Sequence, residues 1–381
     1  MNIGIIKERA QNETRVAVVP SHIPALIKKG YGVLIEKDAG KAAGYADHLY
    51  KDKGATVKET LEALVAESDI LLTVRSANAS DDDTVLHQLT KKHILIGLLE
   101  PYSPSPTFNT LVDKEVSSFS MELIPRTTRA QSMDVLSSMA NLAGYQSVII
   151  GANESPKMFP MMMTAAGTIT PAHVFVLGVG VAGLQAIATA KRLGAVVSAY
   201  DVRSEVKEQV ESLGAKFVEF DLESAEGEGG YAKKMDDAFY ERQRQMMLEE
   251  LKTKDVVITT ANIPGKKAPI LITEAMVKAM PNGSVIIDLA AERGGNCELT
   301  KMGKTIIKHG VKIVGPQNLP AELVYNASML YSKNITTYLL NLFTEDHTIN
   351  LDDDIVKATV VTHKGTIPNA HVAAMIGGTK S

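Results

Sequence analysis

The 381-residue sequence predicts an α/β protein with two doubly wound, parallel-sheet (Rossmann-like) domains joined by long helices. Three observations lead to this class. The chain is longer than one hydrophobic core normally organises. Strand-like and helix-like segments alternate twice along it, which is typical of parallel sheets with crossover helices. A long helix-like segment follows each alternation.

The first alternation begins at the N-terminus. Its segments read as strand, helix, strand, helix and three further strands, namely NIGIIK, SHIPALIKKG, YGVLIEKDAG, ATVKETLEALVAES, DILLTV, KHILIGLLEP and SSFSMELIP. The C-terminal tail contains ELVYNASMLYSKNITTYLLNLF, a long apolar helix that would return to this domain. We therefore assign residues 1–136 and 319–381 to a discontinuous first domain.

The second alternation begins with the strand HVFVLG at residue 173. A glycine turn, the helix AGLQAIATAKRLG, the strand AVVSAYD, the helix EVKEQVESLG and the strand AKFVEF follow it. Later strands are DVVITTA, GSVIIDLA and VKIVG. Residues 137–318 are therefore expected to form the second domain, which would bind a nucleotide.

Composition excludes several classes of protein. The formal charge of −4, from 40 Lys and Arg against 44 Asp and Glu, gives no indication of a nucleic-acid partner. The single cysteine, Cys297, allows no disulfide framework and indicates a reducing compartment. No apolar stretch is long enough to be a membrane span, and no histidine or cysteine spacing indicates a metal site.

The segment GVGVAG carries a dinucleotide-binding pattern, with Gly178, Gly180 and Gly183 as its glycines. It follows a strand and opens a helix, so backbone N–H groups at the helix start could hold a pyrophosphate. Asp201 ends the next strand, where a carboxylate would bond the ribose hydroxyls and repel a 2′-phosphate, favouring NAD over NADP. Arg203 leaves NADP open, because a nearby arginine can accommodate that phosphate. A tight turn without a ligand is the other alternative.

Strand ends elsewhere in the second domain offer further candidates. Asn262 follows DVVITTA and should edge the same site, although it could be a turn residue only. Asp288 and Glu292, in IIDLAAERGG, are the available acids or bases, with a plain turn as the alternative. No histidine or lysine stands out as the base that oxidation of an alcohol or amine needs. Hydride transfer between two nicotinamides would need no such base.

The stretch RTTRAQSMDVLSS, residues 126–138, concentrates polar side chains before an apolar pattern. Thr128 and Gln131 have the spacing of a capping box, which predicts that a helix begins here. One face of this helix would be polar and the other apolar, formed respectively by Gln131, Asp134, Ser138, Asn141 and Tyr145, and by Met133, Leu136, Ala140 and Ala143. The polar face has no Lys or Glu, which favours orientation of a polar ligand over a merely solvated surface.

Residues 221–245, DLESAEGEGGYAKKMDDAFYERQRQ, interrupt the second alternation with acidic residues and glycines. A long loop inside an α/β domain is typical of either a functional lid or a disordered segment. The composition alone favours mobility.

Taken together, several segments resemble the NAD(H)-binding component of the proton-translocating transhydrogenases, which belong with the alanine dehydrogenases. These segments are MELIPRTTRAQSMDVLSS, NLAGY, FPMMMTAAGT, LGVGVAGLQAIATAKRLGA, ITTANIPG and IIDLAAERGGNCE. The N-terminal arginine pattern of alanine dehydrogenases is present at Arg15. Their lysine and catalytic histidine are missing, since Thr73 and Arg75 stand in the first matching segment and IGLLEPY has no histidine. The RTTRAQSMD block belongs to the transhydrogenase side alone.

The resemblance implies roles for the polar stretch. Arg126 and the pair Asp134 and Ser137 would hold the nicotinamide carboxamide and its surroundings. Gln131 would reach the nicotinamide ribose and steer the ring toward NADP. The helical wheel favours Ser138 over Ser137, so both serines stay open.

The resemblance also implies cofactor contacts in the second domain. The mobile loop would close over the nucleotide through Gly230, Tyr231 and Met235, with Gln243 beyond it. The adenosine side would be lined by Val181, Asp201, Val202 and Arg203.

The function that the resemblance implies is direct hydride transfer from NADH on this chain to NADP⁺ on a separate NADP-binding component. A membrane proton-channel component would couple this transfer to proton translocation. We expect a homodimer, cytoplasmic and peripheral on the inner membrane through its partner subunits. The alternatives are an NAD-dependent oxidoreductase like alanine dehydrogenase and a non-catalytic NAD-sensing module.

Overall fold

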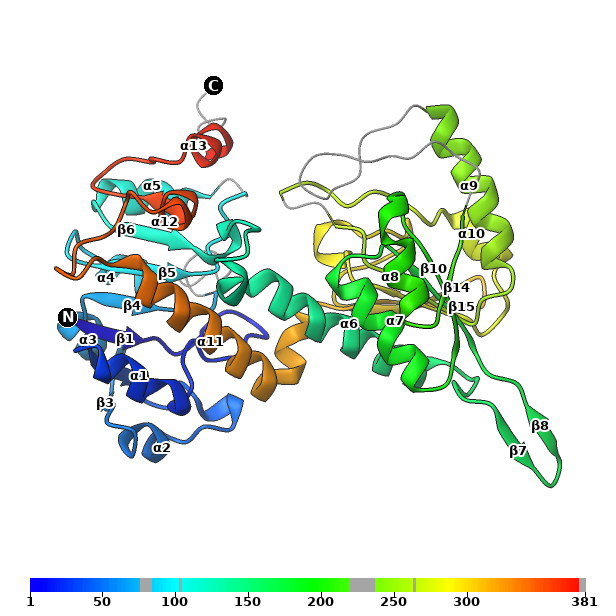
Figure 1. The fold of residues 1–381 in the computed structure, drawn as a ribbon, viewed down its shortest axis with the longest axis horizontal. Helices are drawn as coiled ribbons and strands as arrows, with labels where there is room; N and C mark the ends of the chain where they lie inside the picture. Colours follow the sequence, from blue (N-terminus) through cyan, green and yellow to red (C-terminus); the bar gives the residue numbers. More distant parts are fainter. Residues whose placement is uncertain (76–83, 103–104, 220–236, 263–264, 377–381) are drawn as a thin grey trace. The chain divides into compact units, whose positions relative to one another are not determined.

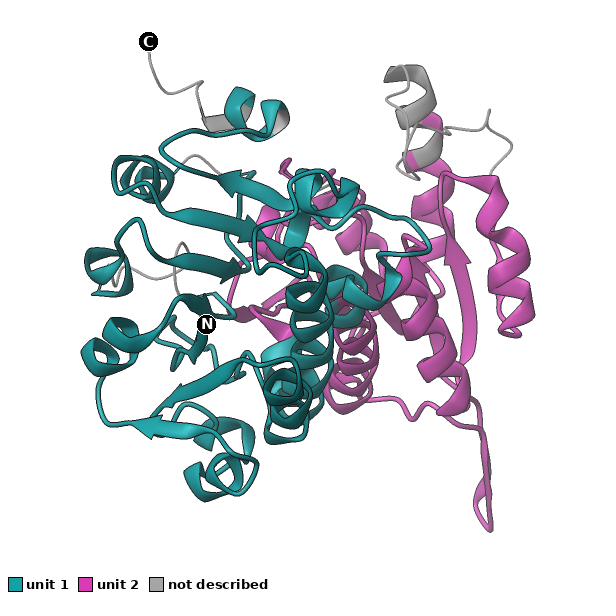
Figure 2. Ribbon diagram, turned by 60° about the vertical axis from the view of Figure 1, so that its left-hand side comes forward, with its two compact units in different colours: residues 1–139, 320–381 teal, residues 140–319 magenta. Residues whose placement is uncertain are grey.

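The computed structural model describes residues 1–75, 84–102, 105–219, 237–262 and 265–376. The chain divides into two compact units (Figures 1 and 2). Unit 1 comprises residues 1–139 and 320–381, and unit 2 comprises residues 140–319. Each unit contains a seven-stranded, mainly parallel sheet, which confirms the predicted fold class.

The sheet of unit 1 has the order β16-β6-β5-β4-β1-β2-β3. Its strands are β1 (Asn2–Ile5), β2 (Gly32–Glu36), β3 (Thr56–Lys58), β4 (Ile70–Leu72), β5 (Ile94–Gly97), β6 (Ser117–Ser120) and β16 (Val360–Thr362). All neighbours pair in parallel except β16, which pairs antiparallel with β6 at the edge. The first six strands therefore have the doubly wound order 3-2-1-4-5-6, which reverses between β1 and β4.

Apolar residues at successive positions build the central strands of unit 1. Ile70, Leu71 and Leu72 of β4 are all fully buried, as expected for a parallel sheet covered on both faces. The helices of this unit are α1 (Ile23–Lys28), α2 (Asp47–Lys51), α3 (Leu61–Glu67), α4 (Thr84–Gln88), α5 (Pro106–Asp113), α11 (Val324–Leu342), α12 (Asp354–Thr359) and α13 (Ala370–Ile376). Helix α11 confirms the long helix predicted in the C-terminal tail.

The sheet of unit 2 repeats the doubly wound order. Its sequence across the sheet is β11-β10-β9-β12-β13-β15-β14. The strands are β9 (His173–Leu177), β10 (Val196–Tyr200), β11 (Lys216–Phe217), β12 (Val256–Thr259), β13 (Val285–Asp288), β14 (Lys304–Lys308) and β15 (Val311–Gly315). Only β14 runs antiparallel, against β15 at the edge. The order reverses between β9 and β12.

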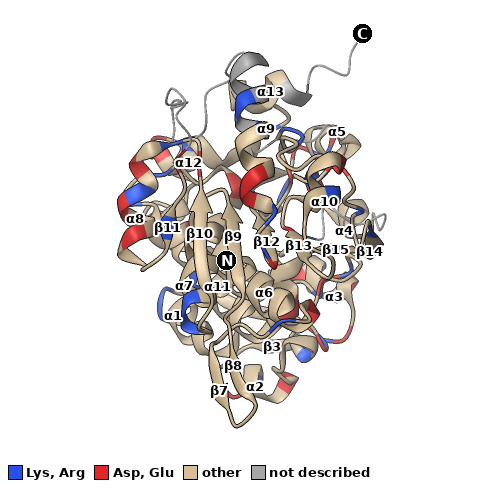
Figure 3. Cartoon of the chain, turned by 90° about the vertical axis from the view of Figure 1, so that its right-hand side faces the viewer, with Lys and Arg blue, Asp and Glu red and all other residues tan. Residues whose placement is uncertain are grey.

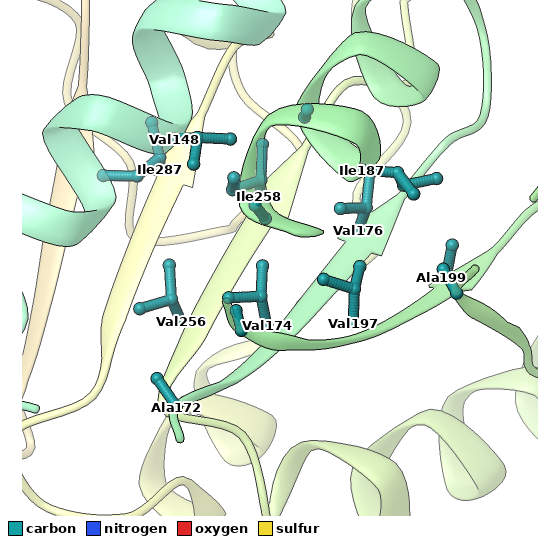
Figure 4. Packing of buried hydrophobic residues seen from close by; sticks show 14 of the residues in the cluster. Val148, Ala172, Val174, Val176, Ile187, Val197, Ala199, Val256, Ile258 and Ile287 are labelled. Carbon is teal, nitrogen blue, oxygen red and sulfur yellow. The ribbon is translucent and has the colours of Figure 1, made fainter. Parts of the chain in front are cut away.

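Alternation along the strands of unit 2 produces two core layers. Val174 and Val176 of β9 pack with Ile187 of α7 (Val181–Arg192) on one face (Figure 4). Phe175 and Leu177 of the same strand point to the opposite core layer. Helices α6 (Val135–Glu154), α8 (Lys207–Ser212), α9 (Asp237–Leu251) and α10 (Glu274–Ala279) complete the helical elements of this region of the chain.

Charge is confined to the periphery of this sheet. The central strands β9, β10 and β12 carry no Lys, Arg, Asp or Glu (Figure 3). Charged side chains follow the strands instead, as Asp201 does after β10. This arrangement gathers polar groups at the strand ends, where a doubly wound sheet binds ligands.

Two regions of the fold differ from the expectation. The segment ATVKETLEALVAES was expected to be one helix, but Thr56–Lys58 forms strand β3 beside β2. Helix α3 then starts after Thr60, whose side-chain oxygen accepts a hydrogen bond from Ala63 N at 3.2 Å. The hairpin of β7 (Met162–Thr164) and β8 (Gly167–Ile169) was not predicted, and Figure 1 shows it extending from unit 2.

Candidate nucleotide-binding site

The three glycines after β9 have different physical reasons to be glycine. Gly178 has φ +92°, a conformation that L side chains rarely adopt. A Cβ on Gly183 would lie 2.0 Å from the carbonyl oxygen of Gly178, so the start of α7 could not pack against the turn. A Cβ on Gly180 would meet no atom within 4 Å. The chain itself therefore requires Gly178 and Gly183, while Gly180 leaves open space beside the turn.

The open space at Gly180 lies at the start of a twelve-residue helix. Gly180 is the N-cap of α7, and no side chain caps this helix. The first N–H groups of a helix have no partner within the helix and attract anions. Val181, the first residue of α7, is 38% exposed, so the helix start is accessible. These features fit a pyrophosphate group, which needs close approach to backbone N–H donors.

Asp201 follows β10 and is held beside the glycine turn. Its Oδ2 accepts hydrogen bonds from Val179 N at 2.7 Å and from Arg203 Nη2 at 3.0 Å. Its Oδ1 accepts from Arg203 N at 2.9 Å and from Arg203 Nε at 3.0 Å. The guanidinium of Arg203 thus forms a two-pronged ion pair with the carboxylate. Val202, between them, is partly buried against the core of unit 2.

The end of β12 closes the other side of the turn. Thr260 Oγ1 donates to Gly178 O at 2.9 Å, and Asn296 Nδ2 donates to Ala261 O at 2.8 Å. Asn262, two residues beyond Thr260, is exposed. The predicted residues Gly178, Asp201 and Asn262 therefore all lie beyond the carboxyl ends of adjacent strands.

The polar stretch in unit 1 begins its helix later than predicted. Thr128 does not cap it, because Gln131–Met133 forms a separate 3₁₀ turn and α6 starts at Val135. The carboxylate of Asp134 accepts hydrogen bonds from Ser137 N at 2.9 Å and from Ser137 Oγ at 2.5 Å. A charged N-terminal cap at Asp134 has displaced the predicted capping box.

The same late start changes the predicted faces. Gln131, Asn141 and Tyr145 are exposed, and Met133 is buried, as expected. Leu136 was expected to pack but is 40% exposed. The reason is that residues 131–133 are not part of the α-helix, so one helical wheel does not run through the whole stretch.

The two serines take different roles. Ser137 is hydrogen-bonded to the carboxylate of Asp134, whereas Ser138 Oγ donates to the backbone oxygen of Asp134 at 3.1 Å. Arg126 and Gln131 are exposed on the same stretch. Asp134 and Ser137 therefore form the hydrogen-bonded pair, beside two exposed polar side chains.

Some expected contacts lie outside the described residues. Gly230, Tyr231 and Met235 fall in residues 220–236, and the side chain of Gln243 on α9 also lies outside the described region. Their assignment to the nucleotide remains a prediction.

The acidic candidates in IIDLAAERGG are not alike. Asp288 is fully buried and accepts hydrogen bonds from Thr259 Oγ1, Ala290 N, Cys297 N and Thr300 Oγ1 at 2.6–3.0 Å. Four donors saturate this carboxylate, so it holds the loop after β13 rather than acting as a base. Burial raises the pKa of Cys297 to about 11, which makes this thiol unreactive near neutral pH. Glu292 is exposed.

The strand ends of unit 1 contain buried carboxylates that the sequence did not single out. Glu8 accepts hydrogen bonds from Thr73 Oγ1 at 2.8 Å, Val74 N at 2.6 Å and Arg75 N at 2.9 Å. These donors follow β4, next to β1 at the reversal point of this sheet. Burial and the charge of Glu13 raise the pKa of Glu8 above its ordinary value of 4.5, although these three bonds oppose the shift.

Two further buried groups lie in this unit. Glu122 accepts hydrogen bonds from Leu99 N at 3.1 Å and Glu100 N at 2.8 Å, and burial raises its pKa. Arg15 is 3% exposed and forms a bidentate ion pair with Glu13. Acids directly after a strand, as in NIGIIKE, were the available sequence signal. Their partners, distant in sequence, were not.

Two kinds of feature are absent from the described residues. They contain no helix that is both long and apolar enough to cross a membrane. They also contain no group of three or more His, Cys, Asp or Glu side chains arranged to hold a metal ion.

A doubly wound sheet with an open glycine turn and a strand-end aspartate is typical of nicotinamide nucleotide oxidoreductases. Comparison with known families agrees with this class. The model of the alanine dehydrogenase/PNT N-terminal domain matches residues 4–143, and that of the C-terminal domain matches residues 147–370. The chain therefore belongs to the alanine dehydrogenase/PNT family.

Within the family, the chain is most similar in sequence to transhydrogenases among the relatives compared. It is 47% identical over 374 residues to the first portion of the NAD(P) transhydrogenase alpha subunit of Rhodospirillum rubrum, a separate protein, covering 96% of this chain and 97% of that protein. The Rickettsia prowazekii protein of the same description is 44% identical over 370 residues, covering 97% and 96%. A transhydrogenase structure from Sinorhizobium meliloti matches with a TM-score of 0.87 and 42% identity, covering 96% of this chain and all of that one. Alanine dehydrogenase 2 of Staphylococcus aureus is a more distant relative, at 29% identity over 388 residues and 98% of this chain. These findings confirm the resemblance to the transhydrogenases.

Proposed function

We propose that this chain binds NADH and passes its hydride directly to NADP⁺ held by a separate NADP-binding component. A membrane proton-channel component would couple the transfer to proton translocation. The observation that carries the proposal is the turn at Gly180, open to a ligand, in a chain 47% identical to a transhydrogenase alpha-subunit protein over nearly its whole length. The nicotinamide ring of NADH supplies the hydride.

Unit 2 would bind the adenosine and pyrophosphate groups. The N–H groups at the start of α7 suit the pyrophosphate, because Gly180 leaves room for close backbone approach. Asp201 would accept hydrogen bonds from the adenosine ribose and repel the 2′-phosphate of NADP. All four donors to its carboxylate come from Val179 and Arg203, so ribose binding requires Arg203 to give up some of its ion-pair contacts. Val181, Val202 and Asn262 would line the adenosine side and its edge.

The polar stretch of unit 1 would act on the nicotinamide end. Arg126 and the Asp134–Ser137 pair would hold the carboxamide and its surroundings, and Gln131 would orient the ribose. The hydrogen bond between Asp134 and Ser137 supports this pairing, because it fixes both side chains in one geometry. Gly230, Tyr231 and Gln243 are proposed to complete the nucleotide contacts.

Oxidation of an amino acid, as by alanine dehydrogenase, is the second candidate. It needs a base near the reacting carbon. Asp288 is saturated by four donors, and Glu8 by three hydrogen bonds around Thr73. We therefore predict that the chain alone turns over alanine or pyruvate far below the rate of about 1 s⁻¹ that is ordinary for enzymes. Turnover at that rate would favour the second candidate.

The proposed assembly is a homodimer at the cytoplasmic face of the inner membrane, attached through its partner subunits. The hairpin β7–β8 supports self-association, because Met161, Met162, Met163 and Ile169 expose 38–79% of their surfaces. Monomers rarely leave such a group of apolar residues in water. Analytical ultracentrifugation should find a dimer that Met163→Glu weakens.

The test of the function mixes the purified chain with the NADP-binding component of a related transhydrogenase. Absorbance should then report rapid hydride exchange between NADH and an oxidised NADP analogue. Gln131→Asn should slow this exchange about tenfold or more while leaving NADH affinity within a few-fold, because small ring displacements cost rate more than binding. Absence of exchange by the wild-type chain would contradict the proposal.

A further inference from the structure

Arg129 lies in the middle of the polar stretch but is turned away from the groups discussed so far. Its Nη1 donates to Asp353 Oδ2 at 2.7 Å and to Asn341 Oδ1 at 3.2 Å. Its Nη2 donates to Asp354 Oδ1. One guanidinium therefore connects residues 126–134 to the end of α11 and the start of α12, more than 200 residues along the chain.

The acceptors of Arg129 are themselves fixed. The second oxygen of Asp353 caps α12, accepting from Ile355 N at 2.9 Å and Val356 N at 3.2 Å. Asn341 Nδ2 also donates to this oxygen at 3.3 Å. The side chain of Asp353 is only 13% exposed. Burial tends to raise the pKa of Asp353, but the hydrogen bonds led by that from Arg129 outweigh it and lower the pKa.

The stretch around Arg129 has little regular structure to fix it. Between Arg126 and Asp134 it consists of turns and the short 3₁₀ segment at Gln131–Met133. Its other attachments are buried Ala130 and Met133, and a hydrogen bond of 2.9 Å from Asn334 Nδ2 of α11 to Ser132 O. These contacts hold the backbone at and after residue 130, whereas Arg129 holds the residues before it.

We propose that Arg129 is a positioning residue, which fixes residues 126–134 on α11 and α12 so that Arg126 and Gln131 meet the nicotinamide end in one geometry. This inference rests on the proposed function of the stretch. An Arg fork bonded to two carboxylates and an amide loses little freedom for each bond made. Hydride transfer is sensitive to displacements of about 1 Å, so a loosened stretch would slow transfer more than it would weaken binding.

The test compares Arg129→Ala, Arg129→Lys and Asp353→Asn with the matched control Lys357→Ala. Lys357 lies on the same short helix, and its partner Asp352 is 4.0 Å away and fully exposed. Three quantities are measured for each protein: the transfer rate with the NADP-binding component, the NADH dissociation constant, and hydrogen–deuterium exchange of a peptide covering residues 126–134.

Arg129→Ala should slow transfer about tenfold or more while NADH affinity stays within about threefold. Exchange in residues 126–134 should become faster, while exchange in α5 of the same unit stays the same. Arg129→Lys should be intermediate because a single ammonium replaces the fork. Lys357→Ala should behave as wild type. If Arg129→Ala does not fold, Arg129→Lys and Asp353→Asn carry the test, since both keep the cap of α12.

Two results would overturn the inference. One is unchanged exchange in residues 126–134 together with a wild-type rate. The other is an affinity loss as large as the rate loss, which would mean that Arg129 contacts the nucleotide directly. A wild-type chain that transfers no hydride would contradict the proposed function instead. In that case, unchanged exchange in Arg129→Ala would still refute the positioning role.

Discussion

The two sheets of this chain share one strand order but differ in what lies where that order reverses. In unit 2, β9 runs into a glycine turn with open space at Gly180. In unit 1, β1 runs into Glu8, whose carboxylate accepts hydrogen bonds from Thr73, Val74 and Arg75 after β4. The same topology therefore builds a place for a ligand in one unit and fills it with an internal anion in the other.

This difference shows that a doubly wound sheet supplies only the location of a site. Backbone N–H groups point outward beyond the carboxyl ends of the strands in both units. In unit 1, Glu8 and Glu122 already satisfy such donors. In unit 2, no side chain caps α7. Whether those donors remain available for a ligand depends on single residues.

The largest expected effect comes from removing the internal anion. Glu8→Ala would leave two buried N–H groups and a hydroxyl without their acceptor, and should cost about 3 kcal/mol in the free energy of unfolding of unit 1. Urea unfolding monitored on the purified chain measures this cost. The control Glu67→Ala, at a 54% exposed side chain paired with Lys58, should cost about 0.5 kcal/mol or less. Equal costs for both variants would deny the structural role of Glu8.

The next largest effect concerns the open turn. Gly180→Ala should weaken NADH binding about tenfold or more, because its methyl group would occupy the space that the pyrophosphate needs. Its backbone has φ −83°, and its Cβ meets nothing, so thermal stability should not change. Gly183→Ala should instead lower stability through its clash with Gly178 O. Fluorescence titration and thermal melting distinguish the two, and full NADH affinity in Gly180→Ala would break the contrast between the sheets.

A smaller effect is expected on selectivity. NADH should bind more tightly than NADPH, and Asp201→Asn should narrow the difference roughly fivefold, about 1 kcal/mol, by removing the charge that opposes the 2′-phosphate. Asp255→Asn is the control, since Asp255 contacts Lys157 and His173 N before β12 and should leave the ratio unchanged. Equilibrium dialysis gives both affinities. Equal affinities in the wild-type chain would refute the assignment of Asp201.

The smallest effect is a pH dependence confined to unit 1. The pKa values of Glu8 and Glu122 are raised in the folded chain, so the folded state retains their protons more strongly than the unfolded state does. Their contribution to stability is therefore fully present below about pH 4.5 and is lost as pH rises through the folded pKa, by at most about 1.4 kcal/mol per pH unit for each group. Glu122→Gln should flatten this slope in denaturant titrations. A slope as steep as in the wild-type chain would show that Glu122 does not titrate in this way.

The sequence predicts best what is local. The glycine pattern, Asp201 and the strands around them depend on neighbours within one strand–turn–helix unit, and the observed fold confirms these elements. The antiparallel edge strand β16 and the role of Glu8 depend on partners 65 or more residues away, which no local pattern contains.

Side-chain competition explains the remaining differences. Thr128 had the spacing of a cap, but the carboxylate of Asp134 caps α6 instead and delays its start. The ion pair of Arg203 with Asp201 was not predictable, because the sequence gives two candidate roles to this arginine without its orientation. The positioning role proposed for Arg129 likewise depends on α12, which becomes a neighbour only in the folded chain.

The contrast between the two sheets is tested most directly by hydrogen–deuterium exchange of the wild-type chain with and without saturating NADH. We expect slower exchange in the presence of NADH at Gly178–Gly183 and at residues 201–203. We expect no change at residues 6–9 and 73–75, where the donors already bind Glu8. Protection at the strand ends of unit 1 with none at the glycine turn would contradict the proposed contrast.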